Sequence, residues 1–370
     1  MSRKVIIALN TAWNLVNFRA GLIQATVAAG YEVVTVAPQD DYAIRLTALG
    51  CRYVPLPMDN KGTHPGRDLL LLWRFFRLMR REKPDIYLGY TVKPNIYGSL
   101  AAHLLAVPVI NNIAGLGSVF IKGGWLNWLV RSLYRVALSH SAKVFFQNRD
   151  DRALFVSGNL VSDAMTDLLP GSGIDLTRFI PLPLPNKKPL RFLLIARMLW
   201  DKGVGEFVEA ARILRKQGLD AEFCLLGFLD VQNPAAISRL QMNELVEEGV
   251  IRYLGVSDNV AEEIALADCV VLPSYREGIP RTLLEAAAMA RPLVTTDSVG
   301  CRDVVDDGIN GYLCQPRDAT DLADKISEII ALSHAERTAM GLRGRKKMEQ
   351  EFDEQIVINK YLRVIEEILR

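Results

Sequence analysis

The chain has 370 residues, of which 50% are hydrophobic and 23% are charged, and its formal net charge is +2. This length exceeds what one compact core usually holds and fits two domains of ordinary size. The hydrophobic content excludes a disordered chain, and the nearly balanced charge indicates no nucleic acid among the partners.

Strand-like and helix-like stretches alternate through the first half of the chain. Strands are predicted at residues 5–9, 32–37, 51–56, 86–89, 109–113 and 143–147, and helices at residues 18–29, 41–49, 68–81, 95–105 and 125–139. Such alternation predicts a parallel sheet with helices on both faces.

Residues 171–189 carry four prolines among polar residues, which is typical of a linker. The alternation then resumes, with strands near residues 192, 223, 251, 270, 293 and 312 and helices at 204–217 and 282–290. Three final helices, at 318–331, 334–351 and 354–370, have no strand between them. We therefore expect one domain at 1–185, a second at 186–352 and a terminal helix at 353–370.

The five cysteines are scattered and form no Cys-x-x-Cys pair. Several lie in apolar runs, which favours buried, reduced thiols and a cytosolic protein. The amino terminus has too short an apolar run for a signal peptide, and no stretch approaches the ~18–20 apolar residues of a spanning helix. We expect a cytoplasmic protein that touches a membrane only at its surface.

One nine-residue segment, Glu277-Gly-Ile-Pro-Arg-Thr-Leu-Leu-Glu285, carries the clearest functional signal. It follows a predicted buried strand at 269–273 and runs into a helix with Pro280 close to its first turn. A helix start offers unpaired N–H groups to an anion, and carboxylates beside it suit the hydroxyls of a sugar. A glutamate pair on a solvated helix face is the alternative, and the strand and loop before the helix favour the functional interpretation.

A second segment, Arg197-Met-Leu-Trp-Asp-Lys202-Gly203, follows the strand predicted near residue 192 and precedes a helix. Ligands of open parallel sheets bind beyond the carboxyl ends of the strands. Arg197 and Lys202 can together neutralise a diphosphate there. A solvated basic loop is the alternative, and the two glutamates in the same half weigh against it.

Several other chemistries lack their motifs. No Gly-x-Gly-x-x-Gly fingerprint and no Gly-Lys-Ser/Thr phosphate loop occurs, and no two aspartates are spaced as Asp-x-Asp. The four histidines lie far apart in the sequence. We therefore expect neither a bound metal nor a cofactor.

The two segments resemble the motifs of retaining GT-B glycosyltransferases, in particular the large nucleotide-sugar family 4. The resemblance covers nearly the whole chain and is closest to bacterial enzymes that assemble undecaprenyl-diphosphate-linked O-antigen, capsule or N-glycan precursors. It also includes residues 37–40, 115–118, 273–278, 300–303 and 308–313.

This resemblance implies two Rossmann-like parallel-sheet domains that face each other across a cleft. Residues 1–185 would bind the acceptor, residues 186–352 would bind the nucleotide-sugar donor, and the helix at 353–370 would cross back to the first domain. The enzyme would move a hexose or N-acetylhexosamine from a UDP-sugar to a polyprenyl-diphosphate-linked glycan, in the assembly of bacterial surface polysaccharide or glycoprotein. It would work on the inner face of the plasma membrane.

The resemblance also implies roles for individual residues. Arg197 and Lys202 would hold the donor diphosphate and, with Glu277, act in catalysis, while Glu285 would hold the donor ribose. Donor contacts are expected from Arg197, Lys202, Glu277, Gly278, Ile279, Pro280, Arg281, Thr282, Leu283 and Glu285. Acceptor contacts are expected from Asn14, Arg19, Asn111, Gly115 and Gly117.

Two departures from the family concern the first half. Many relatives have a Gly-Gly loop after the first strand, where this chain has Asn10-Thr-Ala-Trp-Asn14. Many also have a histidine after the strand near residue 110, where this chain has Asn111-Asn112. A protein base for the acceptor is therefore not assured, and we expect front-face transfer, in which the leaving diphosphate takes the acceptor proton.

Two predicted helices could touch a membrane. The helix at 68–81 places Arg74, Arg77 and Arg81 on one side, and residues 125–134 are amphipathic and aromatic. Such helices can lie in a lipid interface or simply cover the sheet. A lipid-linked acceptor favours an anionic membrane surface as a partner.

Other functions fit the same architecture. A UDP-sugar epimerase would act without an acceptor, and a phosphorylase would need inorganic phosphate. A two-lobed sugar-binding protein is the non-enzymatic alternative, although it has no use for a diphosphate site.

Overall fold

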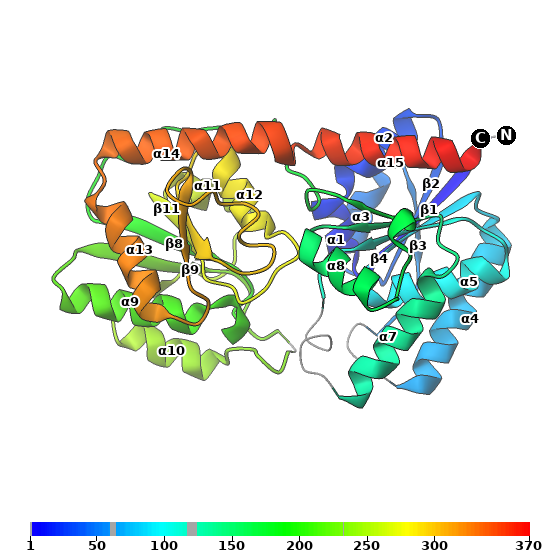
Figure 1. The fold of residues 1–370 in the computed structure, drawn as a ribbon, viewed down its shortest axis with the longest axis horizontal. Coiled ribbons are helices and arrows are strands. Elements are labelled where there is room, and N and C mark those ends of the chain that lie inside the picture. Colours follow the sequence, from blue (N-terminus) through cyan, green and yellow to red (C-terminus); the bar gives the residue numbers. More distant parts are fainter. Residues whose placement is uncertain (1, 60–63, 117–123, 232) are drawn as a thin grey trace. The chain divides into compact units, whose positions relative to one another are not determined.

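The computed structural model describes residues 2–59, 64–116, 124–231 and 233–370 (Figure 1). Its contacts divide the chain into two compact units. The first unit runs to Ser172 and also contains Glu354–Arg370, and the second unit is Gly173–Asp353. The boundary lies after Ser172, which corrects the expected position after residue 185.

The reason for this correction is that the second unit holds the proline-rich segment. The backbone N–H of Ile174 donates to the carbonyl of Phe352 at 2.8 Å. The buried guanidinium of Arg291 donates to the carbonyls of Leu182 and Pro183, each at 3.2 Å. Residues 173–185 are therefore an extended part of the second unit.

The first unit is built on a seven-stranded parallel sheet in the order β3-β2-β1-β4-β5-β6-β7. Its strands are β1 (Lys4–Ala8), β2 (Glu32–Ala37), β3 (Arg52–Pro55), β4 (Ile86–Tyr90), β5 (Val109–Ile113), β6 (Lys143–Phe146) and β7 (Thr166–Leu168). The central strands are buried on both faces, which explains their continuous apolar runs. The strand order reverses between β1 and β4, and sheets of this kind bind ligands beyond the carboxyl ends at such a point.

Helices cover both faces of the first sheet. One face carries α1 (Ala12–Phe18), α2 (Ala20–Ala28), α3 (Ala43–Thr47) and the C-terminal α15 (Glu354–Leu369), which share one hydrophobic cluster. The other face carries α4 (Pro65–Glu82), a π-helical turn (Pro94–Gly98) and α5 (Ser99–Leu104), with α7 (Trp125–Leu138) and α8 (Arg149–Ser157) beyond them. Figure 1 shows α5 beside both α4 and α7.

The second unit is built on a six-stranded parallel sheet in the order β10-β9-β8-β11-β12-β13. Its strands are β8 (Leu190–Ile195), β9 (Ala221–Leu226), β10 (Arg252–Tyr253), β11 (Cys269–Leu272), β12 (Leu293–Thr296) and β13 (Gly311–Cys314). α9 (Val204–Lys216), α10 (Arg239–Glu247) and α13 (Ala319–Ala331) pack on one face, with α9 and α13 side by side in Figure 1. α11 (Val260–Ala265) and α12 (Arg281–Ala288) pack on the other, and α14 (His334–Lys347) lies against α12.

The predicted elements differ from the observed ones mainly where an element is short. The helix expected at 18–29 is observed as α2, but α1, which precedes it, was not expected. The Thr11 side chain caps α1 by accepting from the N–H of Asn14, and Arg19 separates the two helices because it leaves the helical conformation with φ −134°. Sequence periodicity missed α8, α10, α11 and β7, since none of them exceeds nine residues.

Two expectations about the whole chain can be compared with the described residues. All five cysteines lie within them, and each is buried and free, so the prediction of buried thiols is confirmed. Within the described ranges, no helix is both long enough and apolar enough to span a bilayer.

Candidate active site

The first site loop follows β8 and contains Arg197 and Lys202. It closes in a short 3₁₀ turn (Trp200–Lys202), after which Gly203 adopts φ +76° and α9 begins. A Cβ atom on Gly203 would lie 2.1 Å from the carbonyl oxygen of Pro273. Only glycine fits there, and this close approach places Lys202 beside the loop that follows the neighbouring strand β11.

The second site loop follows β11 and carries Glu277. The side chain of Lys202 donates to Glu277 Oε1 and forms an ion pair with it. The hydroxyl of Ser274 donates to the same oxygen at 2.8 Å. The sequence predicts Lys202 and Glu277 in one half of the chain, and the structure brings their charged atoms into direct contact.

A third loop, after β12, packs against the backbone of Glu277. The backbone N–H of Glu277 donates to the carbonyl of Val299 at 2.9 Å. Gly300 follows with φ +82°, and a Cβ atom there would lie 2.3 Å from the carbonyl oxygen of Gly278 and 2.5 Å from that of Glu277. The two loops therefore pack backbone to backbone. The segment at 300–303 belongs to the family resemblance, and this contact gives its first residue a physical role.

The helix that follows, α12, carries the second glutamate. Glu285 forms an ion pair with Arg281, one turn earlier, at 3.1 Å. Burial raises the pKa of the Glu285 carboxyl, while the positive charges of Arg281 and Arg178 act in the opposite direction. Arg178 comes from the segment predicted to be a linker, and the proline-rich composition of that segment does not indicate that its charge acts on Glu285.

The other expected donor contacts lie around the start of α12. Gly278 and Pro280 are buried, and Ile279 and Thr282 are half-buried. Leu283 has a fully buried side chain, and its backbone N–H already donates to the carbonyl of Pro280 at 3.1 Å. At this helix start, we therefore expect the donor contacts from the residues of the loop and first turn that precede Leu283.

Arg197 differs from the other charged residues of the site. Its side chain is exposed, and within the described part of the chain it takes part in no ion pair. Lys202, Glu277, Arg281 and Glu285 have side chains that are only 13–17% exposed. The site therefore combines two shielded ion pairs with one cation that solvent reaches.

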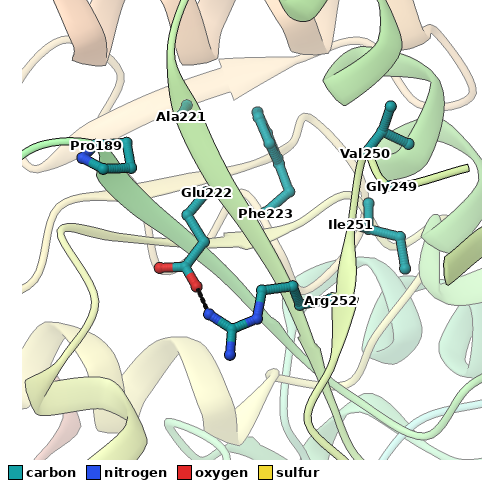
Figure 2. A pocket seen from close by; sticks show the side chains of 8 residues that line it. All are labelled: Pro189, Ala221, Glu222, Phe223, Gly249, Val250, Ile251 and Arg252. Carbon is teal, nitrogen blue, oxygen red and sulfur yellow. Dashed lines mark hydrogen bonds and ion pairs between the residues drawn. The ribbon is translucent and has the colours of Figure 1, made fainter.

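A surface hollow in the same unit lies at the opposite end of the sheet (Figure 2). It is lined by Pro189, by the first residues of β9 and by residues 249–252, which lead into β10. Glu222 and Arg252 pair with each other across it. Because ligands of parallel sheets bind at the carboxyl ends and these polar groups satisfy one another, we do not assign this hollow to the reaction.

The expected acceptor residues lie in the first unit, and Asn111 is the least accessible of them. It is fully buried in β5. Its amide group donates to Asn95 Oδ1 at 2.9 Å and to the Ser99 hydroxyl at 2.8 Å, and its carbonyl oxygen accepts from Ser141 at 2.6 Å. These bonds hold the π-helical turn and α5 against the sheet, and they leave its side chain little capacity for a ligand.

The other acceptor candidates lie near the carboxyl end of the first sheet. Asn14 on α1 donates through its amide to Asn10 Oδ1 at 3.0 Å. Arg19 is 5% exposed, and its guanidinium carbon lies 4.5 Å from the ring centre of Tyr90. Gly115 follows β5 with φ +133°, and Gly117 lies outside the described residues.

Two parallel α/β sheets, with cations and carboxylates converging at the carboxyl ends of β8 and β11, are typical of enzymes that bind nucleotides or their sugar derivatives. Two family models match consecutive parts of the chain. The model for a glycosyl transferase 4-like domain matches residues 17–171, and the model for glycosyl transferases group 1 matches residues 189–331. The chain belongs to this glycosyltransferase family.

Relatives that match most of the chain agree with this assignment. The N,N'-diacetylbacillosaminyl-diphospho-undecaprenol α-1,3-N-acetylgalactosaminyltransferase of Campylobacter jejuni is 28% identical, over 96% of each chain. The capsular polysaccharide biosynthesis glycosyltransferase CapM of Staphylococcus aureus is 24% identical, over 78% of each chain. Nothing in these comparisons supports the alternative of an epimerase or a phosphorylase.

Solved structures show the same fold. A glycosyltransferase from Rickettsia africae superposes with a TM-score of 0.80 and 16% identity, covering 100% of this chain and 99% of the other. HepE of Anabaena, solved in complex with UDP, has a TM-score of 0.77 and 16% identity, covering 99% and 100%. The prediction of a GT-B glycosyltransferase with two parallel-sheet domains is confirmed.

Proposed function

We propose that the enzyme moves a hexose or N-acetylhexosamine from a UDP-sugar to a polyprenyl-diphosphate-linked glycan, with retention of configuration. The observation that carries this proposal is the meeting of Lys202 with Glu277, beside the start of α12 and Glu285. The name of the Campylobacter jejuni relative supports a lipid-diphosphate acceptor. An Escherichia coli relative, 24% identical over 68% of each chain, is named as a UDP-Gal:α-D-GlcNAc-diphosphoundecaprenol α-1,3-galactosyltransferase and supports a UDP-sugar donor.

In this proposal the second unit binds the donor. Lys202 and Arg197 neutralise the diphosphate, the first from a shielded position and the second from solvent. Glu285 accepts hydrogen bonds from the ribose hydroxyls, and Glu277 accepts them from the transferred sugar. The start of α12 adds backbone N–H groups and the positive end of its dipole.

The transfer step follows from which groups can carry charge and protons. The bond from the sugar anomeric carbon to the β-phosphate oxygen breaks, and the acceptor hydroxyl oxygen bonds to that carbon on the same face. The acceptor proton passes to the departing phosphate oxygen, so the step needs no protein base. Arg197 and Lys202 stabilise the negative charge that develops on the leaving diphosphate, which removes the need for a metal or cofactor.

The test of this function is transfer from a panel of UDP-sugars to a polyprenyl-diphosphate-linked glycan. We expect one UDP-hexose or UDP-N-acetylhexosamine to give an α-linked product, with the rate unchanged by a chelator of divalent metals. A sugar isomer formed without acceptor would instead identify an epimerase, and a dependence on inorganic phosphate would identify a phosphorylase.

Contact with an anionic membrane on the cytoplasmic face is part of the proposal, and α4 offers the surface for it. Leu69, Leu70 and Trp73 are 68%, 43% and 52% exposed, and the guanidinium carbon of Arg77 lies 5.4 Å from the Trp73 ring centre. Two arginines of the stripe expected from the sequence already bind other groups of the protein. Arg74 donates to the carbonyl of Pro57 at 2.7 Å, and Arg81 pairs with its neighbour Glu82. The exposed apolar residues therefore join Arg77 as the membrane candidates.

Glutamate at both Leu69 and Trp73 is expected to abolish sedimentation of the protein with anionic vesicles at low salt. The two changes remove apolar area that would enter the lipid interface and add charges that repel it. Their exposed positions should leave folding intact. Vesicle co-sedimentation at low and high salt is the measurement.

The matched control is Ile44→Glu, because Ile44 on α3 is 80% exposed and α3 covers the other face of the sheet. That variant should sediment as wild type does. Equal sedimentation of the Leu69/Trp73 double variant and the wild type would show that α4 is an ordinary solvated helix.

A further inference from the structure

Both carboxylates that we assign to the donor are bound to cations of the same site. Glu277 is paired with Lys202, which follows a different strand. Glu285 is paired with Arg281 on the same helix at 3.1 Å. The side chains of all four residues are only 13–17% exposed, so water screens these pairs weakly. The groups that would bind a sugar nucleotide are therefore engaged with each other.

A diphosphate is a stronger partner for these cations than a single carboxylate is. It carries more negative charge, its oxygens match the planar fork of an arginine, and α12 starts at Arg281 with N–H groups that favour an anion. A carboxylate released from its cation, in turn, suits the hydroxyls of the ribose and the sugar, which donate hydrogen bonds.

We propose that the donor opens its own site by exchanging two ion pairs. The diphosphate draws Lys202 away from Glu277 and Arg281 away from Glu285, and the freed carboxylates then accept the sugar and ribose hydroxyls. This inference rests on the proposed function and adds to it the state of the site before binding. It also makes the hydroxyls of the donor necessary for tight binding of its diphosphate.

The surroundings of the two carboxylates fit such an exchange. Glu277 keeps the hydrogen bond from the Ser274 hydroxyl at 2.8 Å when Lys202 leaves. Glu285 keeps the nearby positive charge of Arg178, which lowers the pKa of the carboxyl against the effect of burial. Each carboxylate therefore retains one favourable neighbour while the cation moves. A ligand that binds the cations but offers no hydroxyl loses the most binding free energy, because nothing replaces the cations at the two shielded carboxylates.

Inorganic pyrophosphate is such a ligand and gives the sharpest test. Calorimetry should show that Glu277→Gln binds pyrophosphate about tenfold more tightly than wild type, because the competitor for Lys202 is gone. Glu285→Gln should also bind pyrophosphate more tightly than wild type, because the carboxylate that competes for Arg281 is gone. Both variants should lose this advantage, or bind more weakly than wild type, with the complete UDP-sugar.

The control for a general change in charge is Glu206→Gln. Glu206 lies on α9 near the same loops and accepts from the Tyr275 hydroxyl at 2.6 Å, but it is paired with neither Lys202 nor Arg281. If Glu206→Gln gained as much affinity for pyrophosphate as Glu277→Gln, the proposed exchange would be overturned. Unchanged or weaker pyrophosphate binding by Glu277→Gln would overturn it too. Thermal unfolding of each variant shows that the fold is kept. Failure of wild type to bind UDP would count against the proposed function, whereas the pyrophosphate comparison tests the exchange by itself.

Discussion

Alanine at Lys202 is expected to remove about 2–4 kcal/mol of transition-state stabilisation, measured as the fall in kcat/KM with the true donor. The reason is that negative charge grows on the diphosphate as the glycosidic bond breaks, and Lys202 lies where water screens it little. Alanine at Arg197 should act in the same direction with a smaller effect, since its side chain is exposed.

Lys216→Ala is the matched control, because Lys216 is an exposed lysine at the far end of α9, away from the carboxyl ends of the strands. Its kcat/KM should equal that of wild type. Near-normal turnover in both the Lys202 and Arg197 variants would refute the assignment of these two cations to the diphosphate.

Alanine at Gly203 is expected to destabilise the enzyme by about 3 kcal/mol and to weaken UDP binding. Its Cβ atom would lie 2.1 Å from the carbonyl oxygen of Pro273, so the loop after β8 must move away from the loop after β11. That movement separates Lys202 from Glu277. Thermal unfolding with and without UDP measures both effects.

The chain contains a control with the same backbone conformation. Gly218 also has φ +76°, but a Cβ atom there meets nothing within 4 Å. Gly218→Ala should therefore cost only the strain of a left-handed alanine, about 1 kcal/mol, and leave UDP binding unchanged. Similar losses in the two variants would show that the backbone conformation, and not the contact with Pro273, governs the effect at Gly203.

Much of the fold follows from local patterns in the sequence. Buried parallel strands need continuous apolar runs, and the helices between them need an apolar stripe, so both are visible without any partner. The same patterns placed Arg197 and Lys202 after one strand and Glu277 after another. Short elements such as α11 and β7 were not predicted, because so few residues show no clear hydrophobic periodicity.

The acceptor candidates show what local sequence patterns do not predict. Asn111 stands where many members of the family have a histidine, yet it is buried and bonded to Asn95, Ser99 and Ser141. Which polar residues meet inside the sheet depends on packing between distant segments. Composition likewise suggested a free linker, where Arg291 holds Leu182 and Pro183 against the second unit.

The chain by itself determined the strands, the loops and the kinds of charge that the loops carry. Only the tertiary structure decided that Lys202 binds Glu277, 75 residues away, and that Gly300 packs against the backbone of Glu277 and Gly278. The physical reason is the strand order: β8 lies next to β11 and β11 next to β12, so three loops meet at one edge of the sheet. That order results from packing both faces of the whole sheet, which no single segment encodes.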